Sequence, residues 1–218
     1  MLRRRIEFCA LYLGVPVLLV VLQNRGVKVP IIPALILFAL AMLPVLRRDK
    51  EFEFAEFVRV RTVPRREWFR MAVWFVLNAL LLTVALRFVM PEAMLKFPRE
   101  NPRFWALVML CYPIFSVLAQ SVVYRALYWS RYSGLFPEKY KIPVGAAVFA
   151  FAHLPYANAY ALAFPFVGGL MFLSGYRRTR SLLFANIEHA LYGDFLFTIG
   201  WGQFFFHAGI MRMLENMQ

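Results

Sequence analysis

Polar side chains gather in three short clusters inside stretches of the chain that are otherwise apolar. Ionisable groups in hydrocarbon are costly unless they are paired or hydrated, so they are retained there mainly where they have a function. Guanidinium, imidazole and carboxylate groups held together can activate water and stabilise a developing negative charge, which is the chemistry of hydrolysis. The clusters are Gln120, Ser121, Tyr124 and Arg125; Phe149 and His153; and Glu188, His189 and Asp194.

A spacing of four residues recurs within the first two clusters. Residues i and i+4 share one face of an α-helix, so each such pair points in one direction. Arg125 needs an anionic or carbonyl partner in this environment, and Glu188 and Asp194 are the candidate carboxylates in the late helices. The pairs with this spacing are Gln120 and Tyr124, Ser121 and Arg125, and Phe149 and His153.

Helices must position these clusters, because the composition is that of a polytopic membrane protein. Of the 218 residues, 61% are hydrophobic and 17% are charged, whereas about 25% are charged in a typical soluble domain. A membrane-spanning helix needs about 20 mainly apolar residues. The sequence therefore predicts an all-α bundle of seven transmembrane helices: Ile6–Leu22, Val29–Leu46, Trp68–Met90, Phe104–Trp129, Pro143–Asn158, Ala159–Gly175 and Ser181–Gly200.

This prediction divides the chain into three parts. Residues 1–103 hold the first three helices and a basic loop, and residues 104–200 hold the helices with the three clusters. Residues 201–218 form either an interfacial tail or a short eighth helix.

The net charge of +13 invites a nucleic-acid interpretation, but the cations lie mainly at the ends of apolar runs. This is how membrane proteins fix their orientation, so we expect the lipid bilayer and no nucleic acid as a partner. If the N-terminus is cytoplasmic, 17 of the 25 Lys and Arg residues lie on the inner side and 7 on the outer side. The charge predicts that orientation, and the short loops suit a bacterial inner membrane. The arginines of the loop Glu51–Arg66 are expected to meet anionic lipid head groups.

The predicted helices place the three clusters at one depth. An α-helix rises about 1.5 Å per residue, so Gln120, His153 and His189 lie about 13 to 15 Å from the cytoplasmic ends of their helices. We therefore expect the fourth, fifth and seventh helices to converge on one polar site near the bilayer midplane.

At these residues the chain resembles the CAAX prenyl protease and bacteriocin-processing family of intramembrane endopeptidases, also called CPBP or Abi. The family pattern is EExxxR on one helix, FxxxH on a second, and on a third a histidine followed about four residues later by Asn or a similar residue. Arg125 matches the arginine of the first motif, Phe149 and His153 match FxxxH, and the segment that begins Glu188-His189 resembles the third motif. The resemblance covers Phe104 to Gly200.

The resemblance implies hydrolysis of a peptide bond in a membrane-anchored peptide or protein substrate. In the implied mechanism a glutamate held by Arg125 activates water, His153 assists, and His189 with its neighbour stabilises the oxyanion. We expect Gln120, Ser121, Tyr124 and Phe149 to contact substrate, and no cofactor is implied.

This chain departs from the family pattern at two positions. Gln120-Ser121 replaces the glutamate pair, and Gly193 stands four residues after His189, with Asp194 one place later. A carboxamide can hold a water molecule through hydrogen bonds but cannot act as a general base.

Four functions remain open from the sequence. The first is a peptidase in which Glu188 or Asp194 replaces the lost base, or in which His153 acts alone. The second is a pseudo-protease that binds membrane peptides without cutting them, in an immunity, chaperone or assembly role. A zinc site built from His153, His189 and a carboxylate is the third, although no HExxH motif is present. A transporter with a polar cavity at the midplane is the fourth.

Overall fold

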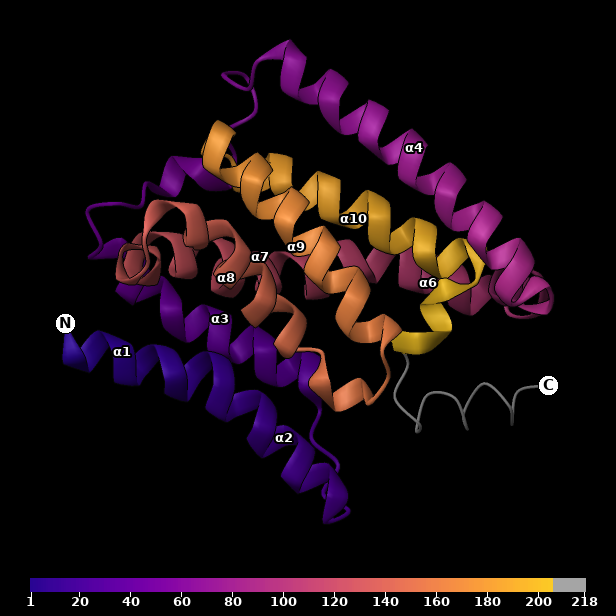
Figure 1. Cartoon of the computed structure of the whole chain (residues 1–218), viewed down its shortest axis with the longest axis horizontal. Coiled ribbons are helices and arrows are strands. Elements are labelled where there is room, and N and C mark those ends of the chain that lie inside the picture. Colours follow the sequence, from indigo (N-terminus) through magenta and orange to yellow (C-terminus); the bar gives the residue numbers. More distant parts are fainter. Residues whose placement is uncertain (206–218) are drawn as a thin grey trace.

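The computed structural model describes residues 1–205, and every regular element in this range is helical (Figure 1). The N-terminal helix is continuous through α1, a π-helical turn and α2, and the long helix that follows α5 combines α-helical and π-helical segments. The elements are α1 (Leu2–Cys9), η1 (Ala10–Gly14), α2 (Val15–Asn24), α3 (Ile31–Arg47), η2 (Phe54–Phe57), α4 (Arg65–Val89), η3 (Pro91–Ala93), α5 (Lys96–Glu100), α6 (Pro102–Cys111), η4 (Tyr112–Val117), α7 (Leu118–Ser121), η5 (Val122–Tyr132), η6 (Ser133–Leu135), α8 (Glu138–Phe151), η7 (Leu154–Tyr156), α9 (Tyr160–Thr179), α10 (Leu182–Ile199) and η8 (Trp201–Phe205).

Each predicted span coincides for most of its length with a helical stretch, so the predicted all-α membrane helix bundle is confirmed. By length and composition, Leu2–Asn24, Arg65–Val89 and Pro102–Leu135 can each cross a membrane, and Ile31–Arg47 is a shorter apolar helix. The sequence placed the end of the fifth span too late, since α8 stops at Phe151 and a 3₁₀ turn follows. Pro155 in that turn lacks the amide hydrogen that would continue the helix.

Helix α4 marks a surface that faces lipid. Only 6% of its most apolar window is buried, and large apolar side chains such as Phe69, Leu80 and Phe88 are exposed along it. In Figure 1, α4 forms one flank of the bundle and α1 with α2 forms the other, while α10, α9 and α6 lie between them. An apolar surface of this extent is stable against lipid tails but not against water.

The long helix changes from α-helical to π-helical hydrogen bonding at two places near the first polar cluster. Its π-helical segment η4 contains Pro113 near its start, where the missing amide hydrogen breaks the regular α-helical ladder. A second π-helical segment, η5, follows Ser121 and carries the buried Arg125. Such segments are rare and often occur at functional sites.

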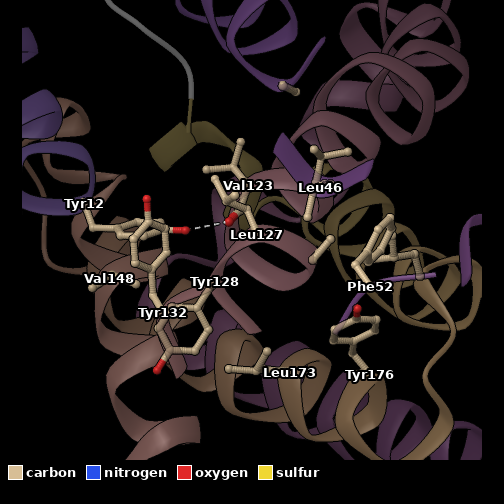
Figure 2. Close-up of a cluster of buried hydrophobic side chains, with 14 of the residues drawn as sticks. Tyr12, Leu46, Phe52, Val123, Leu127, Tyr128, Tyr132, Val148, Leu173 and Tyr176 are labelled. Carbon is tan, nitrogen blue, oxygen red and sulfur yellow. Dashed lines mark hydrogen bonds between the residues drawn. The ribbon is translucent and has the colours of Figure 1, made fainter. Parts of the chain in front are cut away.

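The largest buried core holds this helix against α1, η1, α3 and α9 (Figure 2). Tyr12 is fully buried, and its hydroxyl donates to the carbonyl of Val123 at 2.8 Å, shown as the dashed line in Figure 2. Tyr128 and Tyr132 pack against the same ring with centroid distances of 6.1 and 5.6 Å. The N-terminal helix thereby fixes the position of η5.

Two buried carboxylates hold the start of α4 and the loop before it against the end of α9 and the turn after it. Glu56 pairs with Arg180 at 2.7 Å and accepts a hydrogen bond from the Tyr176 hydroxyl. Glu67 pairs with Arg178 at 2.8 Å. The sequence assigned the arginines of this loop to lipid head groups, but Arg59 instead binds Glu53 and donates to the carbonyl of Arg180. The protein's own carboxylate and carbonyl satisfy that guanidinium.

The predicted alternatives for the tail, an interfacial segment or an eighth helix, concern mainly residues outside the described range. Within that range, Trp201–Phe205 forms a short 3₁₀ helix after α10.

Candidate active site

The structure joins the first and third polar clusters through a chain of hydrogen bonds. Arg125 is 3% exposed; its guanidinium donates to the Ser121 hydroxyl and, from Nη2, to Nδ1 of His189 at 3.1 Å. Nε2 of His189 lies 3.0 Å from the hydroxyl of Tyr112. A guanidinium can only donate, so Nδ1 of His189 must accept, and the ring is neutral with its proton on Nε2. Arg125 therefore sets the tautomer of His189, and the His189 Nε2–H donates to Tyr112.

Two phenylalanines enclose this pair of side chains. The Arg125 guanidinium carbon lies 5.7 Å from the ring centre of Phe149 and 5.1 Å from that of Phe172. His189 stacks on Phe172 with a centroid distance of 4.7 Å. The sequence led us to expect a carboxylate or carbonyl as the partner of Arg125; its hydrogen bonds go to neutral side chains, and Glu188 attracts its charge only through space. Cation–π contacts of a desolvated guanidinium contribute about 2 kcal/mol.

His153 joins the same cluster from the end of α8. Its ring meets the ring of Phe149 at 5.1 Å, and Phe149 meets His189 at 5.5 Å. Its Nδ1 lies 2.9 Å from the Phe149 carbonyl oxygen, which can only accept, so Nδ1 carries the proton. In the neutral ring Nε2 therefore has a free lone pair. The cluster brings together residues of η5, α8 and α10, as the common depth of the three motifs suggested.

His153, His189 and the two phenylalanines border a large cavity of about 1710 Å³. Most of its wall is apolar and comes from the α2–α3 region, α4, α6, α9 and α10. Among the described residues that line it there is no Asp or Glu. Its polar wall near the cluster contains Tyr112, Ser116, Gln120, His153 and His189.

Gln120 occupies the wall position where the resemblance implies a glutamate. Its Nε2 donates to the Ser116 hydroxyl at 2.7 Å, while its Oε1 is buried without a hydrogen-bond partner. Ser121 is fully buried and points instead to Arg125. The two residues of the altered motif thus face different surroundings, one the cavity and the other the arginine.

Neither candidate replacement base lines the cavity. Glu188 is 5% exposed, and its Oε2 has no hydrogen-bond partner. A Cβ atom at Gly175 of α9 would lie 2.9 Å from that oxygen, so the carboxylate is directed at α9. Asp194 is half-buried, and its Oδ1 is also unpartnered.

The described residues contain no group of three or more His, Cys, Asp and Glu side chains placed to hold a metal ion. His189 in particular has both ring nitrogens engaged, by Arg125 and Tyr112.

Sequence reasoning missed Tyr112 and Ser116. Both precede Gln120 on the same helix at intervals of four residues, and all three line the cavity. A polar row at positions i, i+4 and i+8 in an apolar helix is the pattern that could have identified them.

Comparison with known proteins agrees with the motifs. Residues 102–193 match the family model of the type II CAAX prenyl endopeptidase Rce1-like proteins, a segment that begins at α6 and ends in α10. No curated protein and no solved structure matches the chain. The kind of protein this supports is a CAAX-type intramembrane endopeptidase, whose substrates are membrane-associated proteins. The recognition made from the three motifs is thus confirmed, since residues 102–193 match the model of the Rce1-like family.

Proposed function

We propose that this chain uses its Rce1-like scaffold to hold a membrane-anchored peptide or protein tail in the cavity without glutamate-assisted cleavage. The observation that carries this proposal is where Gln120 and the candidate base Glu188 lie relative to the cavity. Gln120 stands on the cavity wall, whereas the carboxylate of Glu188 is turned toward Gly175. Glutamate-assisted hydrolysis needs a base within hydrogen-bond reach of the attacking water.

The remainder of the site is suited to binding. The cavity offers the side chains of Tyr112, Gln120 and His153 on a mainly apolar wall. A few polar groups on a mainly apolar wall orient a ligand while the apolar surface supplies affinity. A peptide close to its lipid anchor has both kinds of surface.

The test uses the purified chain in lipid nanodiscs with a mixed set of lipid-anchored fluorogenic peptides. We expect the wild type to bind members of the set and release no fragment. The double variant Gln120→Glu, Ser121→Glu should release fragments. A glutamate at 121 would meet the guanidinium that now binds the serine hydroxyl, and one at 120 would stand on the cavity wall.

A matched control adds His153→Ala to the double variant and should abolish the restored cleavage. Fragment release by the wild type that survives purification to homogeneity would overturn the proposal. So would a failure of every peptide to bind.

A second candidate is hydrolysis with His153 as the base, and the hydrogen bond between its Nδ1 and the Phe149 carbonyl favours it. That bond leaves the Nε2 lone pair available on a residue that lines the cavity. This candidate predicts wild-type cleavage that is lost in His153→Gln and retained in Glu188→Gln and Asp194→Asn.

We also propose that the N-terminus and the loop between α3 and α4 face the cytoplasm of a bacterial cell, with the chain in the inner membrane. The excess of Lys and Arg on that side supports this orientation. Single cysteines introduced at exposed Arg4 and Arg25 should differ in labelling by an impermeant maleimide in intact cells, with only position 25 accessible. Labelling at position 4 alone would reverse the topology.

A further inference from the structure

Tyr112 is the residue through which the buried hydrogen-bond chain reaches the cavity. It lies in η4, its hydroxyl is 3.0 Å from Nε2 of His189, and it lines the cavity wall. The ring is held edge-on by two neighbours, with a centroid distance of 5.9 Å to His189 and 5.3 Å to Phe197. These contacts leave the hydroxyl in one defined place.

The direction of the hydrogen bonds determines what this hydroxyl can offer a ligand. Arg125 donates to Nδ1 of His189, so His189 donates from Nε2 and the Tyr112 oxygen accepts. The hydroxyl hydrogen of Tyr112 remains free, since its oxygen has no other hydrogen-bond partner in the described part of the chain. An accepted bond from a neutral imidazole, itself polarised by a guanidinium, strengthens the hydroxyl as a donor.

Gly193 makes the space for Tyr112. A Cβ atom at position 193 would lie 2.2 Å from Cε1, 2.4 Å from the hydroxyl oxygen and 2.5 Å from Cζ of Tyr112. The backbone of Gly193 lies inside α10 and does not have a positive φ, so no turn requires glycine there. Glycine in a helix interior costs about 1 kcal/mol relative to alanine, and here packing supplies the reason for it.

We propose that the Tyr112 hydroxyl is the donor that binds a carbonyl oxygen of the peptide held in the cavity. In this arrangement Gly193 leaves room for the tyrosine ring, and His189 fixes the position of the hydroxyl. The inference rests on the proposed function and names the group that binds the carbonyl oxygen of the ligand. The chemical class recognised is a carbonyl group in an amide or ester, with a hydrogen-bond donor elsewhere on the same ligand.

Gln120 provides the second point of contact. Its Oε1 accepts no hydrogen bond and is enclosed by protein, while the rest of the side chain lines the cavity beside Tyr112. Tyr112 and Gln120 are eight residues apart on one helix, and both line the same cavity.

The seating of Tyr112 is tested without any ligand. Gly193→Ala should lower the midpoint of thermal unfolding in detergent by about 5 °C or more, as expected of an overpacked interior. In a Tyr112→Ala background the same substitution should cost much less, because the clashing ring is gone. Gly134→Ala is the control, since a Cβ at Gly134 meets nothing within 4 Å. An equal cost of Gly193→Ala in both backgrounds would overturn the inference.

Carbonyl recognition is tested with a lipid-anchored alanine tetrapeptide in nanodiscs. Tyr112→Phe, which keeps the ring and removes the hydroxyl, should weaken binding about tenfold, the effect of one lost hydrogen bond in a desolvated site. Tyr192→Phe is the control because Tyr192 also lines the cavity but its hydroxyl bonds to Asn78. It should change binding less than twofold.

A backbone series then locates the carbonyl. Each peptide bond of the probe is replaced in turn by a reduced CH₂–NH linkage, and the effect of Tyr112→Phe should disappear for one member of the series only. Wild-type binding that Tyr112→Phe leaves unchanged would overturn this inference and spare the proposed function. Failure of the wild type to bind the tetrapeptide would also overturn this inference, whereas the proposed function falls only if no peptide of the mixed set binds.

Discussion

Nη2 of Arg125 lies 3.1 Å from Nδ1 of His189, and this contact ties η5 to α10 across 64 positions of the sequence. Removing the guanidinium leaves a buried imidazole nitrogen without its donor. We expect Arg125→Met, which keeps most of the apolar volume, to reduce the free energy of unfolding by about 2 kcal/mol. Unfolding by denaturant in mixed micelles measures this.

The same variant should change the protonation pattern of His189. Without the donor at Nδ1, the tautomer is no longer held with its proton on Nε2, and ¹⁵N chemical shifts of the labelled ring report the change. Arg125→Lys should not restore the wild-type shifts, because an ammonium cannot bond Ser121 and His189 with the fixed fork of a guanidinium. Unchanged shifts in Arg125→Met would contradict the assigned network.

The ion pair between Glu56 and Arg180 is predicted to stabilise the loop between α3 and α4. Glu56 is 1% exposed and also accepts from Tyr176, so Glu56→Gln leaves Arg180 without its buried counter-ion. Breaking a buried pair from one side costs about 3 kcal/mol or more. Limited proteolysis within residues 51–64 should accelerate together with the loss of stability.

Glu53→Gln is the matched control for this prediction. Glu53 pairs with Arg59 in the same loop, but its side chain is 68% exposed. Exposed ion pairs contribute about 0 to 1 kcal/mol. Similar losses of stability in Glu53→Gln and Glu56→Gln would contradict the prediction, because burial would then not determine how much each ion pair contributes.

Gly169 sets the closest approach of α8 and α9. A Cβ at Gly169 would lie 2.9 Å from the Cα of Ala146, and backbone cannot move aside as a side chain can. At neighbouring Gly168 the nearest atom belongs to the Phe172 side chain, at 2.8 Å. Small residues allow membrane helices to pack this closely. We expect Gly169→Ala to destabilise the protein more than Gly168→Ala, as read from the unfolding midpoint in detergent.

The helices and the convergence of the three polar clusters could be predicted from the sequence, because both depend on patterns among residues that are close in the chain. Apolar runs of membrane length define the spans, and a polar side chain inside such a run must find a partner on another helix. The link between Arg125 and His189 is therefore the kind of contact that spacing and depth anticipate.

Other features depended on contacts between distant residues, which no local pattern records. The row of polar residues marks the helix face of Tyr112, but its contacts with His189 and Gly193 of α10 become clear only in the folded structure. The direction of Glu188 is set in the same way by the space at Gly175. The end of α8 was misplaced because an apolar run continues through a 3₁₀ turn in which the hydrogen-bonding pattern changes but hydropathy does not.

Glu188 is predicted to act on stability rather than on the ligand. Its Oε2 is buried without a hydrogen-bond partner beside Gly175, an arrangement that costs about 1 to 3 kcal/mol when the group is left unsatisfied. Glu188→Gln replaces the carboxylate with a neutral group of the same shape, so the unfolding midpoint should stay level or rise. Glu188→Ala is the comparison, since it leaves a cavity and should lower the midpoint. A loss of peptide binding in Glu188→Gln at unchanged stability would contradict this prediction, because it would show that the carboxylate takes part in ligand binding.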